Sequence, residues 1–312
     1  MVTLMIVAKI ILTTLRGIKK TGIIKGPGTD LDAELRKARK YNGTHPYKEP
    51  ANRKAVYRTI QVGQHPCLVI RQGKPSGKAI LFLHGGGDRN TWKPEVSFAR
   101  TYGKRAGMDV FYPIYPPFTE ASLVETADLI LKVYQEIVRK YGSDKVAVIG
   151  SSYGGLLAMQ LLTWINRNNA CDKHEYIGMP RLLIMNSPFG YPKTDGQWKL
   201  AEKLEKEDPF IPVGAFRFML GLTLKTAPDT PDCLLYPVDM DFRDAPETCV
   251  FYAEEACAAV SDAIRQRYEQ DGVGEKLNLH IEPSMMHCYA LAPVFKESKR
   301  DFNKQIALLK EM

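Results

Sequence analysis

Short segments that are apolar throughout alternate with amphipathic segments along most of the chain after about residue 55. Two alternating runs, residues 56–63 and 66–73, predict a β-hairpin that turns at Gly63. Segments without polar positions predict strands that are covered on both faces, as in parallel sheets. Such strands are predicted in KAILFLHGGG (78–87), MDVFYPIYP (108–116), KVAVIG (145–150), PRLLIMNSP (180–188), TCVFYA (248–253) and LNLHIEP (277–283).

Helical periodicity separates these predicted strands. In residues 122–141 the apolar positions recur every three or four residues, and Gly142 supplies a C-terminal stop. Residues 153–167 predict a largely buried helix, and residues 256–270 and 293–311 predict two more. The alternation predicts an α/β fold with a mostly parallel central sheet, helices on both faces and a helical cap.

Two regions do not fit the alternation. Residues 1–50 predict an N-terminal helical extension, which the family resemblance given below implies is part of the cap. A proline- and aromatic-rich insertion, interpreted as a cap, occupies about residues 191–246 of a domain that spans 51–312. The first 20 residues predict an amphipathic helix, since Lys9 interrupts their apolar stretch. No stable membrane insertion is expected from it. Its apolar face docks on the protein, on a second copy in a homodimer, or weakly on a membrane surface.

Composition narrows the class of function. The chain has 312 residues, 45% hydrophobic and 25% charged, with a formal net charge of +8. Its basic residues are scattered and not interleaved with aromatic residues, so we expect no nucleic-acid binding. The 6 cysteines include no C-x-x-C pair, which predicts neither a metal site nor a disulfide framework. Reduced thiols favour a cytoplasmic protein.

The segment AVIGSSYGG, residues 147–155, ends an apolar strand in two serines flanked by glycines. Gly150, Ser152 and Gly154 satisfy G-x-S-x-G, in which a strand turns directly into a helix and projects the central serine above the sheet. We therefore predict Ser152 as a nucleophile, and the amide of Tyr153 at the helix start as an oxyanion donor. A tight or phosphate-binding turn is the alternative.

A second motif, HGGG, follows the strand at 78–83. Its glycines expose backbone amides, which predicts that Gly86 and Gly87 contribute to an oxyanion hole. His84 and Gly85 support the loop; His84 is interpreted as structural, hydrogen-bonding within it. A nucleotide-binding loop is not indicated, because neither G-x-G-x-x-G nor a lysine-bearing P-loop is present.

Together, HGGG and, about 65 residues later, GSSYGG resemble the α/β-hydrolase esterases, and more narrowly the bacterial esterases related to hormone-sensitive lipase. The resemblance covers roughly residues 57–312 and implies a triad in the order serine, acid, histidine, under a lid. Where many relatives have aspartate before the nucleophile, this chain has Ser151.

The resemblance implies a histidine after the last strand, where His287 stands in IEPSMMHCYAL. His280 and His174 are alternatives in a strand and a polar loop. The acid is expected after the strand 248–253, where the chain departs from the family's usual aspartate pattern with two glutamates. Glu255 is favoured and Glu254 is its rival, with two further carboxylates in the region, Asp262 and Asp244.

These residues predict a serine carboxylesterase that acts on a small-molecule ester with short acyl or acetyl groups and uses no cofactor. Two alternatives stay open. One is an amidase or peptidase on the same fold, and the other is a non-catalytic protein that uses the hydrolase scaffold to bind a ligand.

Overall fold

The computed structural model describes residues 30–51, 54–73, 76–87, 90, 92–207 and 210–312. The amphipathic helix predicted in the first 20 residues lies outside these ranges. Within them, no helix is long and apolar enough to cross a membrane.

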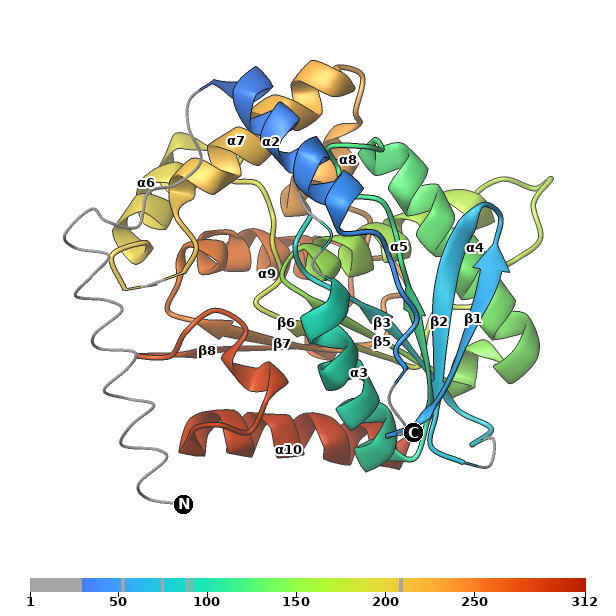
Figure 1. The fold of residues 1–312 in the computed structure, drawn as a ribbon. Helices are drawn as coiled ribbons and strands as arrows, with labels where there is room; N and C mark the ends of the chain where they lie inside the picture. The colour runs from blue at the N-terminus through green and yellow to red at the C-terminus, as the bar shows by residue number, and fades with distance from the viewer. Residues whose placement is uncertain (1–29, 52–53, 74–75, 88–89, 91, 208–209) are drawn as a thin grey trace.

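Eight strands within the described ranges form one sheet in the order β1-β2-β4-β3-β5-β6-β7-β8 (Figure 1). The first two strands form the predicted antiparallel hairpin, β2 pairs antiparallel with β4, and every later pair is parallel. The predicted mostly parallel α/β sheet is therefore confirmed. The strands are β1 (Val56–Val62), β2 (His65–Arg71), β3 (Ala79–Leu83), β4 (Asp109–Pro113), β5 (Val146–Ser151), β6 (Leu182–Asn186), β7 (Glu247–Ala253) and β8 (Leu277–Glu282).

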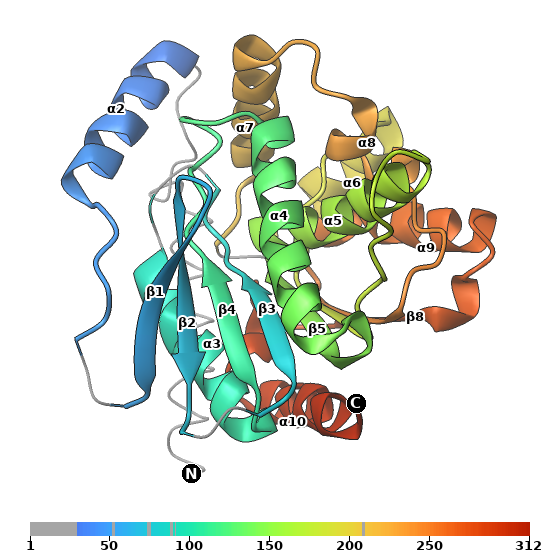
Figure 2. The same cartoon turned by 90° about the vertical axis from the view of Figure 1, so that its right-hand side faces the viewer.

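Helices cover both faces of the sheet, as predicted (Figure 2). Residues of α3 and α10 pack in one apolar cluster, and residues of α4, α5 and α9 pack in a second cluster on the opposite face. The helices in the described ranges are α2 (Leu31–Thr44), α3 (Trp92–Ala106), α4 (Leu123–Tyr141), α5 (Tyr153–Asn169), α6 (Asp195–Leu204), α7 (Val213–Thr226), α8 (Asp232–Leu235), α9 (Ser261–Gln270) and α10 (Lys296–Glu311).

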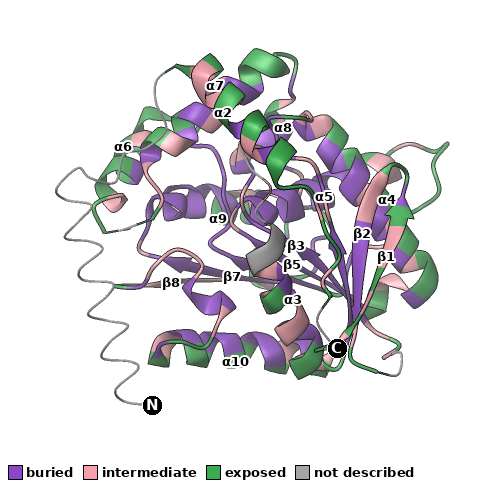
Figure 3. Ribbon diagram, in the orientation of Figure 1, coloured by how far each residue is buried: buried purple, intermediate pink, exposed green. Residues whose placement is uncertain are grey.

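The strand β3 shows why these strands lack polar positions. Leu81 and Leu83 belong to the cluster under α4 and α5, whereas Ile80 and Phe82 belong to the cluster under α3 and α10. Successive side chains of a strand point to opposite faces, so a strand between two helix layers buries every position. In Figure 3 the central strands are accordingly buried along their length.

The helices α2, α6, α7 and α8 lie together beyond the same edge of the sheet (Figure 1). Lys225 of α7 donates to Asp32 of α2 at 2.6 Å, which joins the N-terminal extension to the 191–246 insertion. The side chain of Asn42, also on α2, accepts from the backbone of Asn90 at 2.9 Å, just after the glycine loop. These contacts agree with a cap built from both regions; its division from a catalytic domain stays a prediction.

Candidate active site

Ser152 occupies the junction between β5 and α5, with φ 51° and ψ −118°. A positive φ is costly for a residue with a Cβ and persists only where the surroundings enforce it. The Ser152 side chain makes no capping bond to the helix that it precedes. Its hydroxyl is thus held by a strained turn and is not used to stabilise the helix, as a nucleophile requires.

Close backbone contacts enforce this turn. A Cβ on Gly154 would lie 2.0 Å from the carbonyl oxygen of Leu83, and one on Gly150 would lie 2.5 Å from the carbonyl oxygen of Gly154. No side chain fits at such distances. The two outer glycines of the motif therefore let α5 start directly against β3 and β5, which directs Ser152 to the carboxyl edge of the sheet.

The HGGG loop lies beside Ser152. A Cβ on Gly85 would be 3.3 Å from the Cβ of Ser152, and one on Gly87 would meet the Tyr153 ring at 2.7 Å. In the part of the chain that the structure describes, the backbone N–H groups of Gly86, Gly87 and Tyr153 donate no hydrogen bond. Unused amides next to a nucleophile are what an oxyanion hole requires.

The side chain of His84 stabilises the HGGG loop. Its Nδ1 donates to the carbonyl oxygen of Gly85 at 2.8 Å, and its ring stacks on Tyr115 with centroids 4.1 Å apart. The Tyr115 hydroxyl donates to the His84 carbonyl oxygen. Burial lowers the pKa of His84 to about 4, so the ring is neutral at pH 7.

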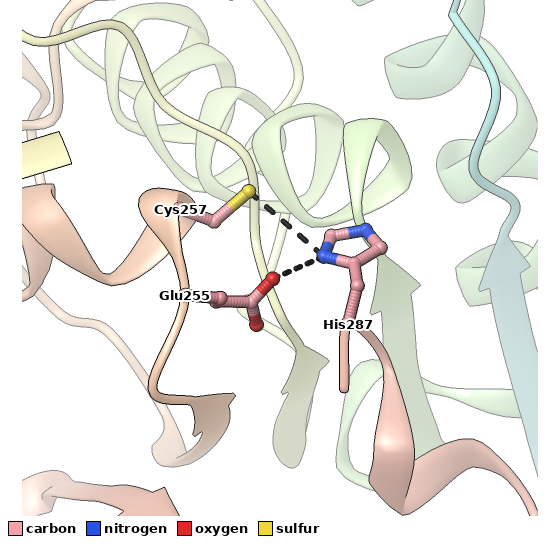
Figure 4. Close-up of side chains that lie close together, drawn as sticks. All are labelled: Glu255, Cys257 and His287. Atoms are coloured by element: carbon pink, nitrogen blue, oxygen red, sulfur yellow. Dashed lines mark hydrogen bonds and ion pairs between the residues drawn. The ribbon is translucent and has the colours of Figure 1, made fainter. Parts of the chain in front are cut away.

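His287 lies in the turn after β8, and Glu255 lies just after β7, on the neighbouring strand. A carboxylate oxygen of Glu255, Oε2, is paired with Nδ1 of His287 (Figure 4). Glu255 is 0% exposed and the His287 side chain 11%. The pairing fixes the Nδ1–H tautomer, because a carboxylate only accepts.

The remaining ring nitrogen of His287, Nε2, is buried and has no hydrogen-bond partner among the described residues. In this tautomer Nε2 carries a lone pair, which is the group that accepts a proton from a nucleophile. Burial lowers the pKa of His287, but the acidic groups around the ring, Cys288, Glu255 and Cys257, raise it by more. The net result is a pKa well above the ordinary 6.5.

Ser187, at the end of β6, links the acid to the histidine turn. Its hydroxyl donates to Oε1 of Glu255 and accepts from the backbone N–H of Cys288 at 2.8 Å. The backbone of Ala253 also donates to Oε1, at 3.2 Å. Sequence reasoning missed Ser187. The available signal was a polar pair, Asn186 and Ser187, at the carboxyl end of an otherwise apolar strand.

The other candidates lie elsewhere. Glu254 is partly exposed, and its backbone N–H pairs with Glu282 at 3.2 Å. His280 pairs with Glu282 at 2.8 Å. The exposed candidates are Asp244, Asp262 and His174. Within the described residues, no hydrogen bond or ion pair joins any of these side chains to His287.

Glu95, on α3, joins the two motifs and was also missed. One carboxylate oxygen accepts from the backbone N–H of Gly85 at 2.8 Å, and the other accepts from the Ser151 hydroxyl at 2.5 Å. Burial raises the pKa of Glu95 to about 7, although both bonds and the nearby His287 lower it. The carboxylate thus holds the glycine loop against the residue before Ser152. No local pattern marks it in the sequence.

We expect Glu95→Ala to lower kcat by about 10²-fold, because the glycine loop loses its register against Ser152 and small misplacements are costly. Glu95→Gln is the matched control: its amide can accept from Gly85 and donate to Ser151, so it should retain most of the rate. The measurement is steady-state hydrolysis of an ester by both variants, with Tm recorded for each. Wild-type kcat in Glu95→Ala would show that this contact does not position the loop.

Comparisons with known proteins identify the family of this chain. A family model described as alpha/beta hydrolase fold matches residues 80–291, a range that includes both motifs, Glu255 and His287. No curated protein matches the chain in sequence.

Solved structures match over nearly the whole chain. EstE5, in a crystal soaked with p-nitrophenyl butyrate, is 20% identical, with a TM-score of 0.75 over 96% of this chain and 97% of its own. An esterase of the bacterial hormone-sensitive lipase family is 19% identical, with a TM-score of 0.73 over 96% and 97%. A putative esterase from Staphylococcus aureus is 20% identical, with a TM-score of 0.74 over 93% and 94%. The alpha/beta hydrolase fold that HGGG and GSSYGG predict is confirmed by the family model.

Proposed function

Because this chain belongs to the alpha/beta hydrolase fold family, we propose that it is a serine carboxylester hydrolase with Ser152, His287 and Glu255 as its triad. The observation that carries the proposal is the pairing of buried Glu255 with Nδ1 of His287, which leaves Nε2 as a free base. The strained turn at Ser152 and the unused amides beside it support the same chemistry.

In the first half-reaction Ser152 gives its proton to Nε2 of His287 and attacks the ester carbonyl carbon. The carbonyl oxygen becomes an oxyanion, which accepts hydrogen bonds from the amides of Gly86, Gly87 and Tyr153. Glu255 stabilises the imidazolium that forms. The imidazolium then protonates the leaving alcohol, and an acyl group stays on Ser152.

In the second half-reaction a water molecule takes the place of the alcohol. His287 removes its proton, the resulting hydroxide attacks the acyl carbon, and the same amides hold the oxyanion. Return of the proton to Ser152 releases the carboxylic acid. The ring therefore alternates between base and acid while Glu255 keeps it in place.

The proposed substrates are esters with short acyl or acetyl groups. Among the cap helices, α7 carries the buried aromatic side chains Phe216 and Phe218, and we infer that a cap packed in this way leaves little room for a long acyl chain. EstE5, which shares the fold, was soaked with a p-nitrophenyl ester of butyric acid.

Hydrolysis of p-nitrophenyl esters from acetate to decanoate, beside matched p-nitroanilides, tests this proposal. We expect kcat/KM to be highest for the shortest acyl chains and hydrolysis of the anilides to be far slower. Equal or faster anilide hydrolysis would favour an amidase. Absence of turnover with every ester would favour a ligand-binding protein.

We expect kcat/KM to rise with pH through the pKa of His287, because only the neutral ring accepts the Ser152 proton. Since that pKa is raised, the midpoint should lie above pH 6.5. Glu95, with a pKa of about 7, titrates in the same range. Glu95→Gln separates the two groups: the acid limb should remain, with its midpoint moved only slightly to lower pH because the Glu95 charge near His287 is lost, and loss of the acid limb would assign the limb to Glu95 instead.

A further inference from the structure

We propose that Glu255, Cys257 and His287 together form a site for one thiophilic divalent cation of the Zn²⁺ type, and that its binding inhibits the enzyme. Their ligand atoms, one oxygen, one sulfur and one nitrogen, all lie within 4.8 Å of one another. In Figure 4 the Cys257 sulfur and the Glu255 carboxylate both face Nδ1 of His287. The predicted inhibition rests on the proposed esterase function, whereas the predicted binding of the cation does not.

The distances between the three ligand atoms suit a zinc ion if the Glu255 carboxylate shifts. Bond lengths of about 2.0–2.3 Å in a tetrahedral site place ligand atoms roughly 3.4–3.6 Å apart. The Cys257 sulfur lies 3.9 Å from Nδ1 of His287, close to that separation. Oε2 of Glu255 stands nearer to Nδ1, at hydrogen-bond distance, so it must withdraw slightly as the cation replaces the shared proton.

The donor set selects the cation. Thiolate, imidazole and carboxylate are zinc ligands, whereas Mg²⁺ and Ca²⁺ prefer oxygen alone. Oε1 of Glu255 accepts from Ser187 and from the backbone of Ala253, which fixes the carboxylate with Oε2 directed at Nδ1 of His287. Such support behind a ligand strengthens metal binding. A water molecule would complete the tetrahedron.

Binding would abolish the base by changing the tautomer of His287. The cation takes the Nδ1 lone pair, the Nδ1 proton moves to Nε2, and the Cys257 thiol releases its proton to solvent. With a proton on Nε2, the ring cannot accept one from Ser152. Of the three ligands, Glu255 and Cys257 are buried and only the His287 side chain is partly exposed, at 11%.

A second thiol, that of Cys288, also lies beside the His287 ring. Its sulfur donates to the backbone oxygen of Asn186 at 3.4 Å, and it is not one of the three clustered ligands. Cys171 is a partly exposed thiol in the loop after α5, far along the chain from the site, and serves as a matched control.

Two readouts test the site on the full-length protein. Cd²⁺ is titrated while the ultraviolet thiolate-to-metal charge-transfer band is recorded, and Zn²⁺ is titrated in an ester hydrolysis assay normalised to each variant's own metal-free rate. We expect saturable binding of one cation and matching inhibition. Cys257→Ser should weaken both by at least ~10-fold. Cys171→Ser should change neither, and Mg²⁺ should not inhibit.

The charge-transfer band reports cation binding whether or not the protein hydrolyses esters. Failure of the metal site and failure of the proposed esterase function can therefore be told apart. An unchanged band in Cys257→Ser, or loss of the band in Cys288→Ser instead, would overturn the site. Binding that depends on Cys257 without inhibition of hydrolysis would overturn its effect on the base. Glu255→Gln keeps the Cys257 thiol and should also weaken Cd²⁺ binding. It replaces Cys257→Ser in this test if that variant folds poorly.

Discussion

Ser152→Ala should lower kcat for ester hydrolysis on the order of 10⁶-fold, to a rate near the limit of detection. The hydroxyl is the only group in the scheme that forms the acyl-enzyme, so its loss removes the covalent route. The oxyanion amides of Gly86, Gly87 and Tyr153 remain, and they leave a residual rate above that of water. Substrate binding is unaffected in this account, so KM should change little.

The neighbouring serine gives a matched control. Ser151→Ala removes a hydroxyl of the same size one residue away, and with it the 2.5 Å bond to Glu95. A lost hydrogen bond of about 1 kcal/mol corresponds to less than about tenfold in rate. Similar losses in the two variants would contradict the assignment of the nucleophile.

Glu255→Gln should lower kcat by about 10⁴-fold with little change in KM. The amide can present its NH₂ group to Nδ1 of His287, which would then be an acceptor, and Nε2 would carry the proton. The variant also removes the negative charge that raises the pKa of His287. The acid limb of the pH profile should therefore move to lower pH, a shift that steady-state kinetics at several pH values measures.

Glu254→Gln is the control for this prediction. It makes the same chemical change at the adjacent position, where the partly exposed side chain makes no hydrogen bond or ion pair with His287 among the described residues. Its kcat should stay close to that of the wild type. A large loss in Glu254→Gln with little effect in Glu255→Gln would reverse the assignment of the acid.

The elements that the sequence predicts are those set by local pattern. The central parallel strands are recognisable because they are apolar on both faces, whereas the edge strand β8 carries Asn278, His280 and Glu282. The end of α4 is recognisable because Gly142 follows it with φ 81°. The predicted helix at 256–270 differs at its start, where Ala256–Val260 form a 3₁₀ turn. There Ala258 donates to the Glu255 carbonyl oxygen three residues back, a tighter pattern than that of an α-helix.

The site was only partly predictable, for a physical reason. Ser152 and the glycine amides belong to motifs whose backbone geometry is encoded within a few residues. The choice between Glu254 and Glu255 depends on the turn after β7, which sequence periodicity does not define. Glu95 and Ser187 act through contacts with segments 56 and 68 residues away, so only the packed structure reveals them.

The central claim is that Ser152 is the residue that becomes acylated. Its most direct test is treatment of the active protein with a fluorophosphonate, followed by peptide mass spectrometry of the segment that contains Ser151 and Ser152. We expect one adduct per chain, located on Ser152, with hydrolysis lost in proportion to labelling and no adduct in Ser152→Ala. An adduct on Ser151 or elsewhere, or full hydrolytic activity after complete labelling of Ser152, would contradict the account.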